Sequence, residues 1–306
     1  MRKTVTILTV CVLSVYCLAG IGCHSRKNKA AEETPNQVSS AGWFDAGTAF
    51  AQKKEYDQAI AAYNNALKAD PLYASAYFYR AQIWEEKGEI DKAIDDYTKV
   101  IKLNPSLENA YNYRGNAWQM KGKLDKALAD YTKALELDPN HAEAYHNRGN
   151  VWGKKGVYDK AIADFTRALE ITPDEAAIYD NRGTAWKKKS DYKRALADYT
   201  KALEIDPNLV ISYNNLAWLL ATCPDSKYRN GAKALEAAQK AAKAKTDASS
   251  LDTLAAANAE MGNFGDAVKI MERIISYLKE QGEKENLSVF TDHLNSYKAR
   301  KPWREK

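Results

Sequence analysis

Asparagine recurs at fixed intervals in this chain. Among the residues that could do chemistry, these asparagines have the spacing that best suits the binding of a peptide. Asn147, Asn181 and Asn215 are separated by one constant interval. A carboxamide carries both donor and acceptor, so a row of them can hold the backbone of an extended peptide without reading its sequence. Helix propensity does not explain the repetition, because asparagine is a mediocre helix former. The alternative is that duplication of a unit copied neutral residues.

Further polar side chains recur in the same repeating unit. They lie one residue before and three residues after the position that these asparagines occupy. Together they form a set of nine candidate peptide-binding residues: Asn112, Asn116, His146, Asn147, Asn150, Asp180, Asn181, Asn214 and Asn215. The partner that such a set predicts is a protein or an extended peptide.

Patterns for catalysis or metal binding are missing from the sequence. No ligand spacing relates the four histidines, which are His24, His141, His146 and His293. The other three cysteines crowd the N-terminus up to Cys23, so Cys223 stands alone and no intramolecular disulfide framework can form. The chain has no Gly-rich phosphate loop, nucleophile elbow or paired-Cys zinc pattern. We therefore expect no enzyme activity, no catalytic residue, no metal, no cofactor and no small-molecule substrate.

The charged residues are interpreted as solvated helix faces. Paired acids such as Asp95 and Asp96 recur with the unit, and Lys187, Lys188 and Lys189 form a basic run. The net charge is +5, from 45 basic and 40 acidic side chains. So small an excess favours solubility and does not indicate nucleic acid as a partner.

The elements that must position these side chains follow from prolines that recur at the same interval, at 71, 105, 139, 173 and 207. With proline at position 32, units begin at residues 40, 74, 108, 142, 176 and 210. Position 8 is Gly or Ala and, in the first five units, position 20 is Ala, so two antiparallel helices can approach closely. Mostly aromatic rings at positions 4, 11 and 24 fill the space between helix pairs. Gly88, Gly122 and Gly156 are placed to end a first helix, and the proline ends each second helix.

This pattern resembles the tetratricopeptide repeat over residues 40 to 280. The resemblance implies an all-α fold, a right-handed superhelix (an α-solenoid) of about seven helix-turn-helix units over residues 40–282. A C-terminal capping helix and tail follow at residues 283–306. The sixth unit carries four extra residues around Cys223 to Tyr228, and the seventh realigns at residue 248.

The resemblance also implies a concave groove lined by first helices, with positions 2, 5, 6, 9, 12 and 13 facing it. The groove changes character along its length. Phe78, Tyr79, Gln82, Glu85 and Glu86 make the second unit aromatic and acidic. The fourth and fifth units are basic, through the lysines at 154, 187 and 188. A bipolar partner is the interpretation that follows.

The N-terminus reads as an export signal. Arg2 and Lys3 precede an apolar run and then small residues, which predicts a signal peptide over residues 1–22. The layout resembles a bacterial lipoprotein signal with Cys23 as the lipidated residue, although Gly20 stands where leucine is usual; ordinary cleavage and an uncleaved anchor are the alternatives. Residues 23–39 then form a flexible tether. We expect an exported protein, lipid-anchored in the cell envelope on the periplasmic face, and His24 after the cysteine favours the outer membrane.

Two functions follow from these expectations, and a third is the alternative against them. The first is a non-enzymatic scaffold or adaptor in envelope assembly that binds a protein or an extended peptide in its groove. The second is a regulatory or substrate-delivery subunit of an envelope hydrolase or protease. The third is an enzyme, which would require titratable groups converging in the groove.

Overall fold

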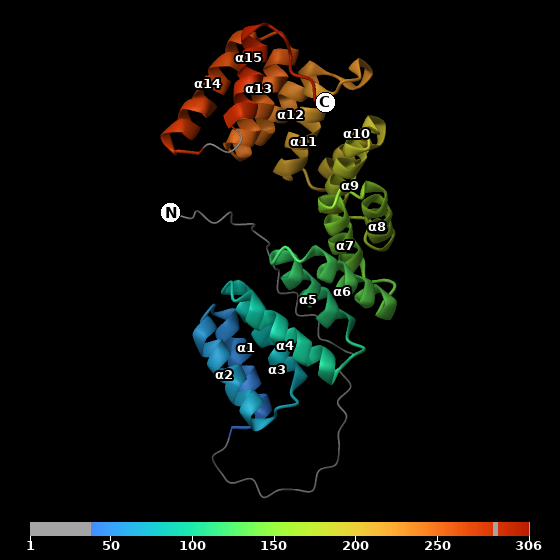
Figure 1. The fold of residues 1–306 in the computed structure, drawn as a ribbon, viewed down its shortest axis with the longest axis vertical. Coiled ribbons are helices and arrows are strands. Elements are labelled where there is room, and N and C mark those ends of the chain that lie inside the picture. The colour runs from blue at the N-terminus through green and yellow to red at the C-terminus, as the bar shows by residue number, and fades with distance from the viewer. Residues whose placement is uncertain (1–37, 284–286, 306) are drawn as a thin grey trace, which may run out of the picture.

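The computed structural model describes residues 38–283 and 287–305, and this part of the chain consists of helices and their connections, with no strand. Fourteen helices form seven antiparallel pairs, and a fifteenth closes the array (Figure 1). The pairs are α1 (Ser40–Gln52) with α2 (Tyr56–Ala69), α3 (Ala74–Glu86) with α4 (Ile90–Leu103), α5 (Glu108–Met120) with α6 (Leu124–Leu137), α7 (Ala142–Lys154) with α8 (Tyr158–Ile171), α9 (Ala176–Lys188) with α10 (Tyr192–Ile205), α11 (Val210–Thr222) with α12 (Gly231–Ala244), and α13 (Ala248–Glu260) with α14 (Phe264–Glu280). The closing helix is α15 (Leu287–Lys298).

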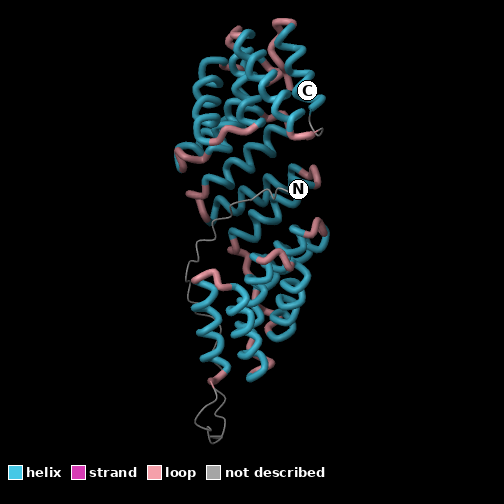
Figure 2. Tube along the Cα trace, turned by 90° about the vertical axis from the view of Figure 1, so that its left-hand side faces the viewer, coloured by secondary structure: helices cyan, strands magenta, loops and turns pink. Residues whose placement is uncertain are grey.

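The pairs stack one on the next into a curved superhelix, and Figure 2 shows this succession from the side. Figure 1 shows the first helices α5 and α7 on the inner side of the curve and their partners α6 and α8 on the outer side. First helices begin at residues 40, 74, 108, 142, 176, 210 and 248, where the sequence sets the units. The predicted all-α superhelix of about seven units with a capping helix is confirmed.

Close packing within a pair depends on the small residue at position 8. A Cβ added to Gly115 would lie 2.6 Å from Cε1 of Tyr131, and one added to Gly149 would lie 2.7 Å from Cε1 of Phe165. The ring at position 24 therefore presses directly on the first-helix backbone. The alanine at position 20 is fully buried in each of the first five repeats, at residues 59, 93, 127, 161 and 195.

Local signals mark the C-terminal ends of the helices. The second residue after the first helix adopts positive φ, 75° at Gly88 and 70° at Gly122, where glycine carries no steric penalty. Lys54 and Ser190 hold the same turn at φ 61° and 60°. After the second helix, Asp70 Oδ1 accepts from the N–H of Leu72 at 2.9 Å, which closes the turn around the proline.

The recurrent acids are not all solvated, and this corrects the sequence interpretation. Arg114 donates from Nε and Nη2 to both oxygens of Asp130, at 2.8 and 2.7 Å, and from Nη1 to Thr98 of the preceding repeat at 3.1 Å. We call this two-point contact the arginine clamp. Four repeats carry it: Arg80–Asp96, Arg114–Asp130, Arg148–Asp164 and Arg182–Asp198. Because the same guanidinium bonds to the preceding repeat, each clamp joins helices within a repeat and joins two repeats.

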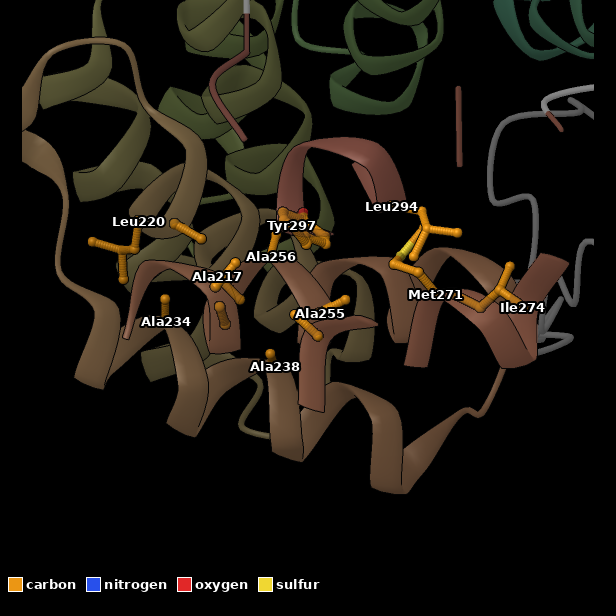
Figure 3. Close-up of a cluster of buried hydrophobic side chains, with 14 of the residues drawn as sticks. Ala217, Leu220, Ala234, Ala238, Ala255, Ala256, Met271, Ile274, Leu294 and Tyr297 are labelled. Atoms are coloured by element: carbon orange, nitrogen blue, oxygen red, sulfur yellow. The ribbon is translucent and has the colours of Figure 1, made fainter. Parts of the chain in front are cut away.

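The C-terminal part is packed differently. One cluster of buried apolar side chains runs from α11 through α12, α13 and α14 to α15, and Figure 3 shows Ala217, Met271 and Tyr297 within it. The sixth pair has a longer connection, with a 3-10 helix at Ser226–Tyr228 between α11 and α12. Cys223 in this connection is fully buried, and burial raises the pKa of its thiol.

No helix within residues 38–283 or 287–305 is long and apolar enough to span a membrane. The predicted signal peptide, Cys23 and almost all of the tether lie outside the described residues.

Candidate functional site

The inner face of the first helices carries the candidate residues, but not all of them face solvent. Position 5 was expected to face the groove, and this is wrong for Asn112, which is fully buried, and for Asp180, which is 3% exposed. The reason is that position 5 lies at the contact between neighbouring first helices. Position 6 of the next repeat covers it.

Residues at positions 5 and 6 form a link from each repeat to the next. Three links are polar, each with its donor at position 6: Asn147 Nδ2 to Asn112 Oδ1 at 3.2 Å, Asn181 Nδ2 to His146 Nε2 at 2.8 Å, and Asn215 Nδ2 to Asp180 Oδ1 and Oδ2 at 3.1 Å. We call these contacts the inter-repeat links. The asparagine series therefore has a structural role that helix propensity could not reveal.

The chemistry of the Asp180 link fixes which end of the carboxamide turns inward, and the other two links have the same orientation in the structure. The Asp180 carboxylate only accepts, so Asn215 must present its NH2 group to it. Nδ2 of Asn181 lies 2.8 Å from Nε2 of His146, and burial lowers the pKa of His146, which favours the neutral ring that can accept at this nitrogen. Asn147, Asn181 and Asn215 are partly exposed, and their oxygens make no hydrogen bond within the described part of the chain. The row therefore offers acceptors rather than complete carboxamides.

Position 9 distinguishes two asparagines that the sequence treats alike. Tyr131 donates its hydroxyl to Asn116 Oδ1 at 2.6 Å, so the oxygen of Asn116 is engaged. The ring facing Asn150 is Phe165, which has no hydroxyl. Neither end of the Asn150 side chain makes a hydrogen bond within the described residues, and the residue is partly exposed. Asn150 is therefore the candidate whose carboxamide is free to hold a ligand at both ends.

The sixth repeat contributes a pocket of about 210 Å³ on the same face. Its lining residues come from positions 2, 5, 6, 9 and 12 of three repeats: Lys187, Asn214, Asn215, Trp218, Ser249, Asp252 and Thr253. Asn214 Oδ1 is buried there without a hydrogen-bond partner, because Thr253 occupies the place of the next asparagine and bonds to Ser249 O instead. The polar inter-repeat links end at this pocket.

The second repeat has an aromatic link and an unusual acid. Phe78 packs edge-on against Tyr113 of the next repeat, with ring centroids 5.2 Å apart. Glu85 accepts from the Tyr97 hydroxyl through Oε2 at 2.8 Å, while its Oε1 is buried and unpaired. Burial raises the pKa of Glu85 to about 7.

Two further histidines, His141 and His293, have structural surroundings. His141 accepts from the N–H of Ala144 at the start of α7 and lies 3.2 Å from Asn109 Oδ1. His293 of α15 contacts Asp252 at 2.8 Å. Within the described ranges, no three His, Cys, Asp or Glu side chains gather in a way that could hold a metal ion.

Comparison with known families agrees with this architecture. Tetratricopeptide repeat models match residues 44–108, 142–175, 176–209 and 198–269, and a TPR repeat model matches residues 120–156. The chain belongs to the tetratricopeptide repeat family. No catalytic family is among these matches. No curated protein is significantly similar to the chain.

Solved structures resemble this chain over much of its length. MamA is 28% identical with a TM-score of 0.51, and the match covers 55% of this chain and 92% of MamA. A tetratricopeptide repeat protein from Parabacteroides merdae ATCC 43184 is 18% identical with a TM-score of 0.62, covering 85% and 98%. YrrB, described as a TPR protein with an unusual peptide-binding site, is 23% identical with a TM-score of 0.50, covering 58% and 91%. The last two likenesses show the fold alone.

Proposed function

We propose that this tetratricopeptide repeat protein is a non-enzymatic scaffold that binds an extended segment of a partner protein along the inner face of repeats 3 to 6. The observation that carries the proposal is the row of accessible asparagine oxygens, with the unengaged carboxamide of Asn150 among them. The peptide-binding site in the description of YrrB supports the same use of this fold.

The geometry suits an extended backbone. Packed helices lie about 8–10 Å apart, and an extended chain advances about 3.3 Å per residue. Successive repeats would therefore meet roughly every third residue of a bound segment. Its N–H groups would donate to the oxygens of Asn147, Asn181 and Asn215, and Asn150 would both donate and accept.

The inter-repeat links decide which variants can test this. Replacing Asn147, Asn181 or Asn215 would break a contact between repeats and confuse stability with binding. Asn150→Ala removes a carboxamide that holds nothing within the described residues, so the fold stays intact. Asn208→Ala, at an exposed loop position, is the matched control.

The test uses peptides selected by phage display on the purified chain. Dissociation constants are then measured by fluorescence anisotropy. Asn150→Ala should weaken binding by roughly 2- to 10-fold, the net value of one or two hydrogen bonds, while Asn208→Ala leaves it unchanged. Equal affinity for the wild type and Asn150→Ala would place the binding surface elsewhere.

The envelope setting is a further part of the proposal. It rests on the sequence of residues 1–22 and on Cys23. A chain expressed in a bacterium should gain lipid at Cys23, measured as an added acyl mass on the N-terminal peptide, and Cys23→Ala should abolish it. An unmodified mature N-terminus in the wild type would refute the lipid anchor.

A further inference from the structure

The segment after α15, residues 299–305, lies on the same inner face that we assign to the partner. We call it the closing segment. The chain turns at Arg300, which has φ 55°, and then runs back past α13 to α11 and α9. Its contacts are 83 and 87 residues away in sequence, at Ala221 and Trp218.

Glu305 is held as a bound acidic residue would be. Its N–H donates to the carbonyl of Thr222 at 3.0 Å. Its carboxylate accepts from Nε1 of Trp218 at 3.0 Å, and Nζ of Lys187 lies 3.5 Å away. Lys187 was expected to be solvated, which is wrong, because its side chain is 13% exposed. Lys187 and Trp218 also line the 210 Å³ pocket.

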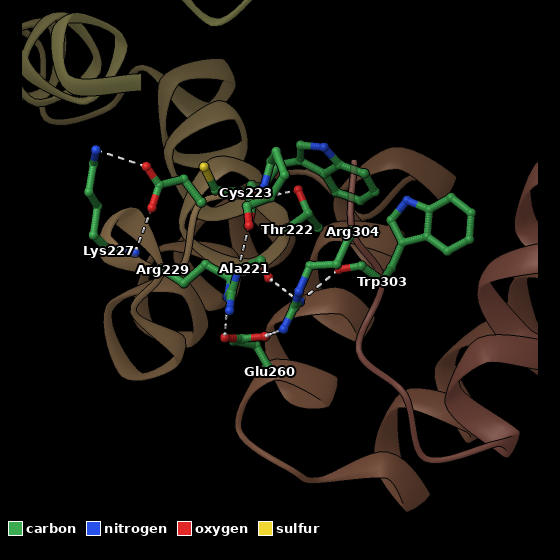
Figure 4. Close-up of polar contacts among 11 residues, drawn as sticks. Ala221, Thr222, Cys223, Lys227, Arg229, Glu260, Trp303 and Arg304 are labelled. Atoms are coloured by element: carbon green, nitrogen blue, oxygen red, sulfur yellow. Dashed lines mark hydrogen bonds and ion pairs between the residues drawn. The ribbon is translucent and has the colours of Figure 1, made fainter. Parts of the chain in front are cut away.

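Arg304 and Trp303 have equally specific surroundings. Arg304 donates to the carbonyl of Ala221 at 3.1 Å and forms an ion pair of 2.7 Å with Glu260 (Figure 4). The same carboxylate bonds Arg229 from its other side at 3.1 Å. The ring of Trp303 lies 4.4 Å from that of His293, centroid to centroid.

The end of α11 explains why a separate segment is needed here. Cys223 follows α11 with an extended backbone, so no glycine turn satisfies the last carbonyls of the helix. The closing segment supplies N–H donors to Ala221 and Thr222 in its place. Another extended chain with the same donors could do so equally well.

We propose that residues 303–305 are an internal occupant of the groove at repeats 5 to 7, and that this site takes a partner segment carrying an aromatic, a basic and an acidic side chain in that order. The proposal rests on the proposed function, since it names the chemistry of a partner in the same groove. Each side chain has its own surroundings: His293 beside the ring, Glu260 for the basic group, and Lys187 with Trp218 for the carboxylate.

The closing segment is part of the chain and therefore competes strongly with a free peptide for the same site. A short linker gives an effective concentration on the order of millimolar. A free peptide of moderate affinity should therefore bind the intact chain at least about tenfold more weakly than a chain whose own segment is released.

The experiment uses the full chain and a blocked peptide with the sequence of residues 299–305, ARKPWRE. The release variant is Arg304→Ala with Glu305→Ala, and thermal melting confirms that it folds. Hydrogen exchange should show the amide of residue 305 at least about tenfold faster in this variant. Anisotropy should show the peptide binding it at least about tenfold more tightly than the wild type.

Two further pairs of variants assign the site. Lys187→Ala added to the release variant should remove most of the gain, and Lys188→Ala, at the exposed neighbouring residue, should not. In the otherwise wild-type chain, Lys187→Glu alone should free the closing segment, and Glu305→Lys in the same chain should restore its protection from exchange.

The outcomes separate this inference from the proposed function. Peptide binding to the release variant that depends on Lys187 supports the inference, even if no displayed peptide depends on Asn150. Equal peptide affinity for the wild type and the release variant, or unchanged exchange at residue 305, overturns it and leaves the Asn150 test standing.

Discussion

Repeats 2 to 5 and the C-terminal part, which comprises repeats 6 and 7 with α15 and the closing segment, are held together by different chemistry. Each of repeats 2 to 5 has an arginine clamp, and its buried apolar clusters have three to seven members. In repeats 6 and 7, Leu216 and Leu254 take the place of the arginine, and 17 buried residues form one cluster. A polar clamp fixes the register of identical units, whereas the apolar cluster ends the array.

The two kinds of packing also leave different inner faces. Between repeats 3 and 6 the links are polar and leave acceptors accessible. At the C-terminal part the inner face is covered by the chain itself, through Arg304 and Glu305. One molecule thus has an inner face that is open at repeats 3 to 5 and covered by its own chain at Trp218 and Ala221.

Removing an arginine clamp should lower the free energy of unfolding more than any other substitution proposed below. Arg148→Ala leaves Asp164 buried without its partner, and unpairing a buried ion pair costs about 3–5 kcal/mol of the free energy of unfolding. Hydrogen bonds to Asp164 raise the pKa of Arg148, which reflects the same stabilisation of the charged form. Chemical denaturation followed by circular dichroism measures the loss.

The control for the clamp is Lys201→Ala, an exposed lysine paired with Glu204 on its own helix, which should leave stability unchanged. A small effect at Arg148 would mean that the apolar clusters hold repeats 2 to 5 as they do the C-terminal part.

The sequence predicts the helices well and the site in part. The recurrent proline marks the end of each of the first five second helices, and Gly88, Gly122 and Gly156 mark the ends of three first helices, because these effects are local. The inter-repeat links join side chains of different repeats, yet the sequence contained a signal for them. For each of Asn147, Asn181 and Asn215, the preceding unit has a polar residue at position 5. The arginine and aspartate of the clamp likewise recur at fixed positions of the unit, and only their burial could not be read from the sequence.

The closing segment could not be predicted in the same way. Its contacts with Trp218 and Ala221 join distant parts of the chain and occur once. No repetition marks such a pair, so only the folded chain brings Glu305 to Lys187.

Two acidic residues of repeat 2 allow a comparison between a carboxylate that is paired with an arginine and one that is not. Asp96 is paired with Arg80, whereas Glu85 has a tyrosine hydroxyl alone. Its pKa of about 7 lies above its ordinary value of 4.5, so between these pH values the folded state holds a proton that the unfolded state has lost. Stability from this group is therefore present below pH 4.5 and is lost as the pH rises through 7.

Glu85→Gln keeps an acceptor for Tyr97 and removes this titration. The variant should match the wild type near pH 4.5 and exceed it by roughly 2–3 kcal/mol at pH 8, measured by urea denaturation at both values. Glu86→Gln, at the exposed neighbour, should show no such divergence. Parallel pH profiles for the wild type and Glu85→Gln would mean that another group satisfies the acid.

Two buried tyrosines, one in each region, allow the contribution of a single hydroxyl group to stability to be compared. Tyr131 of repeat 3 donates to Asn116, and Tyr297 of α15 buries its oxygen without a partner. Tyr131→Phe should cost about 1 kcal/mol, because it removes a made hydrogen bond. Tyr297→Phe should be neutral or stabilising by about 1 kcal/mol, because it removes an unsatisfied group. The double variant, measured by chemical denaturation, should show the sum, since the sites are far apart in the array. Equal losses in the free energy of unfolding at both positions would show that the Tyr297 hydroxyl is stabilised as well as that of Tyr131. The contrast between the two regions would then be wrong.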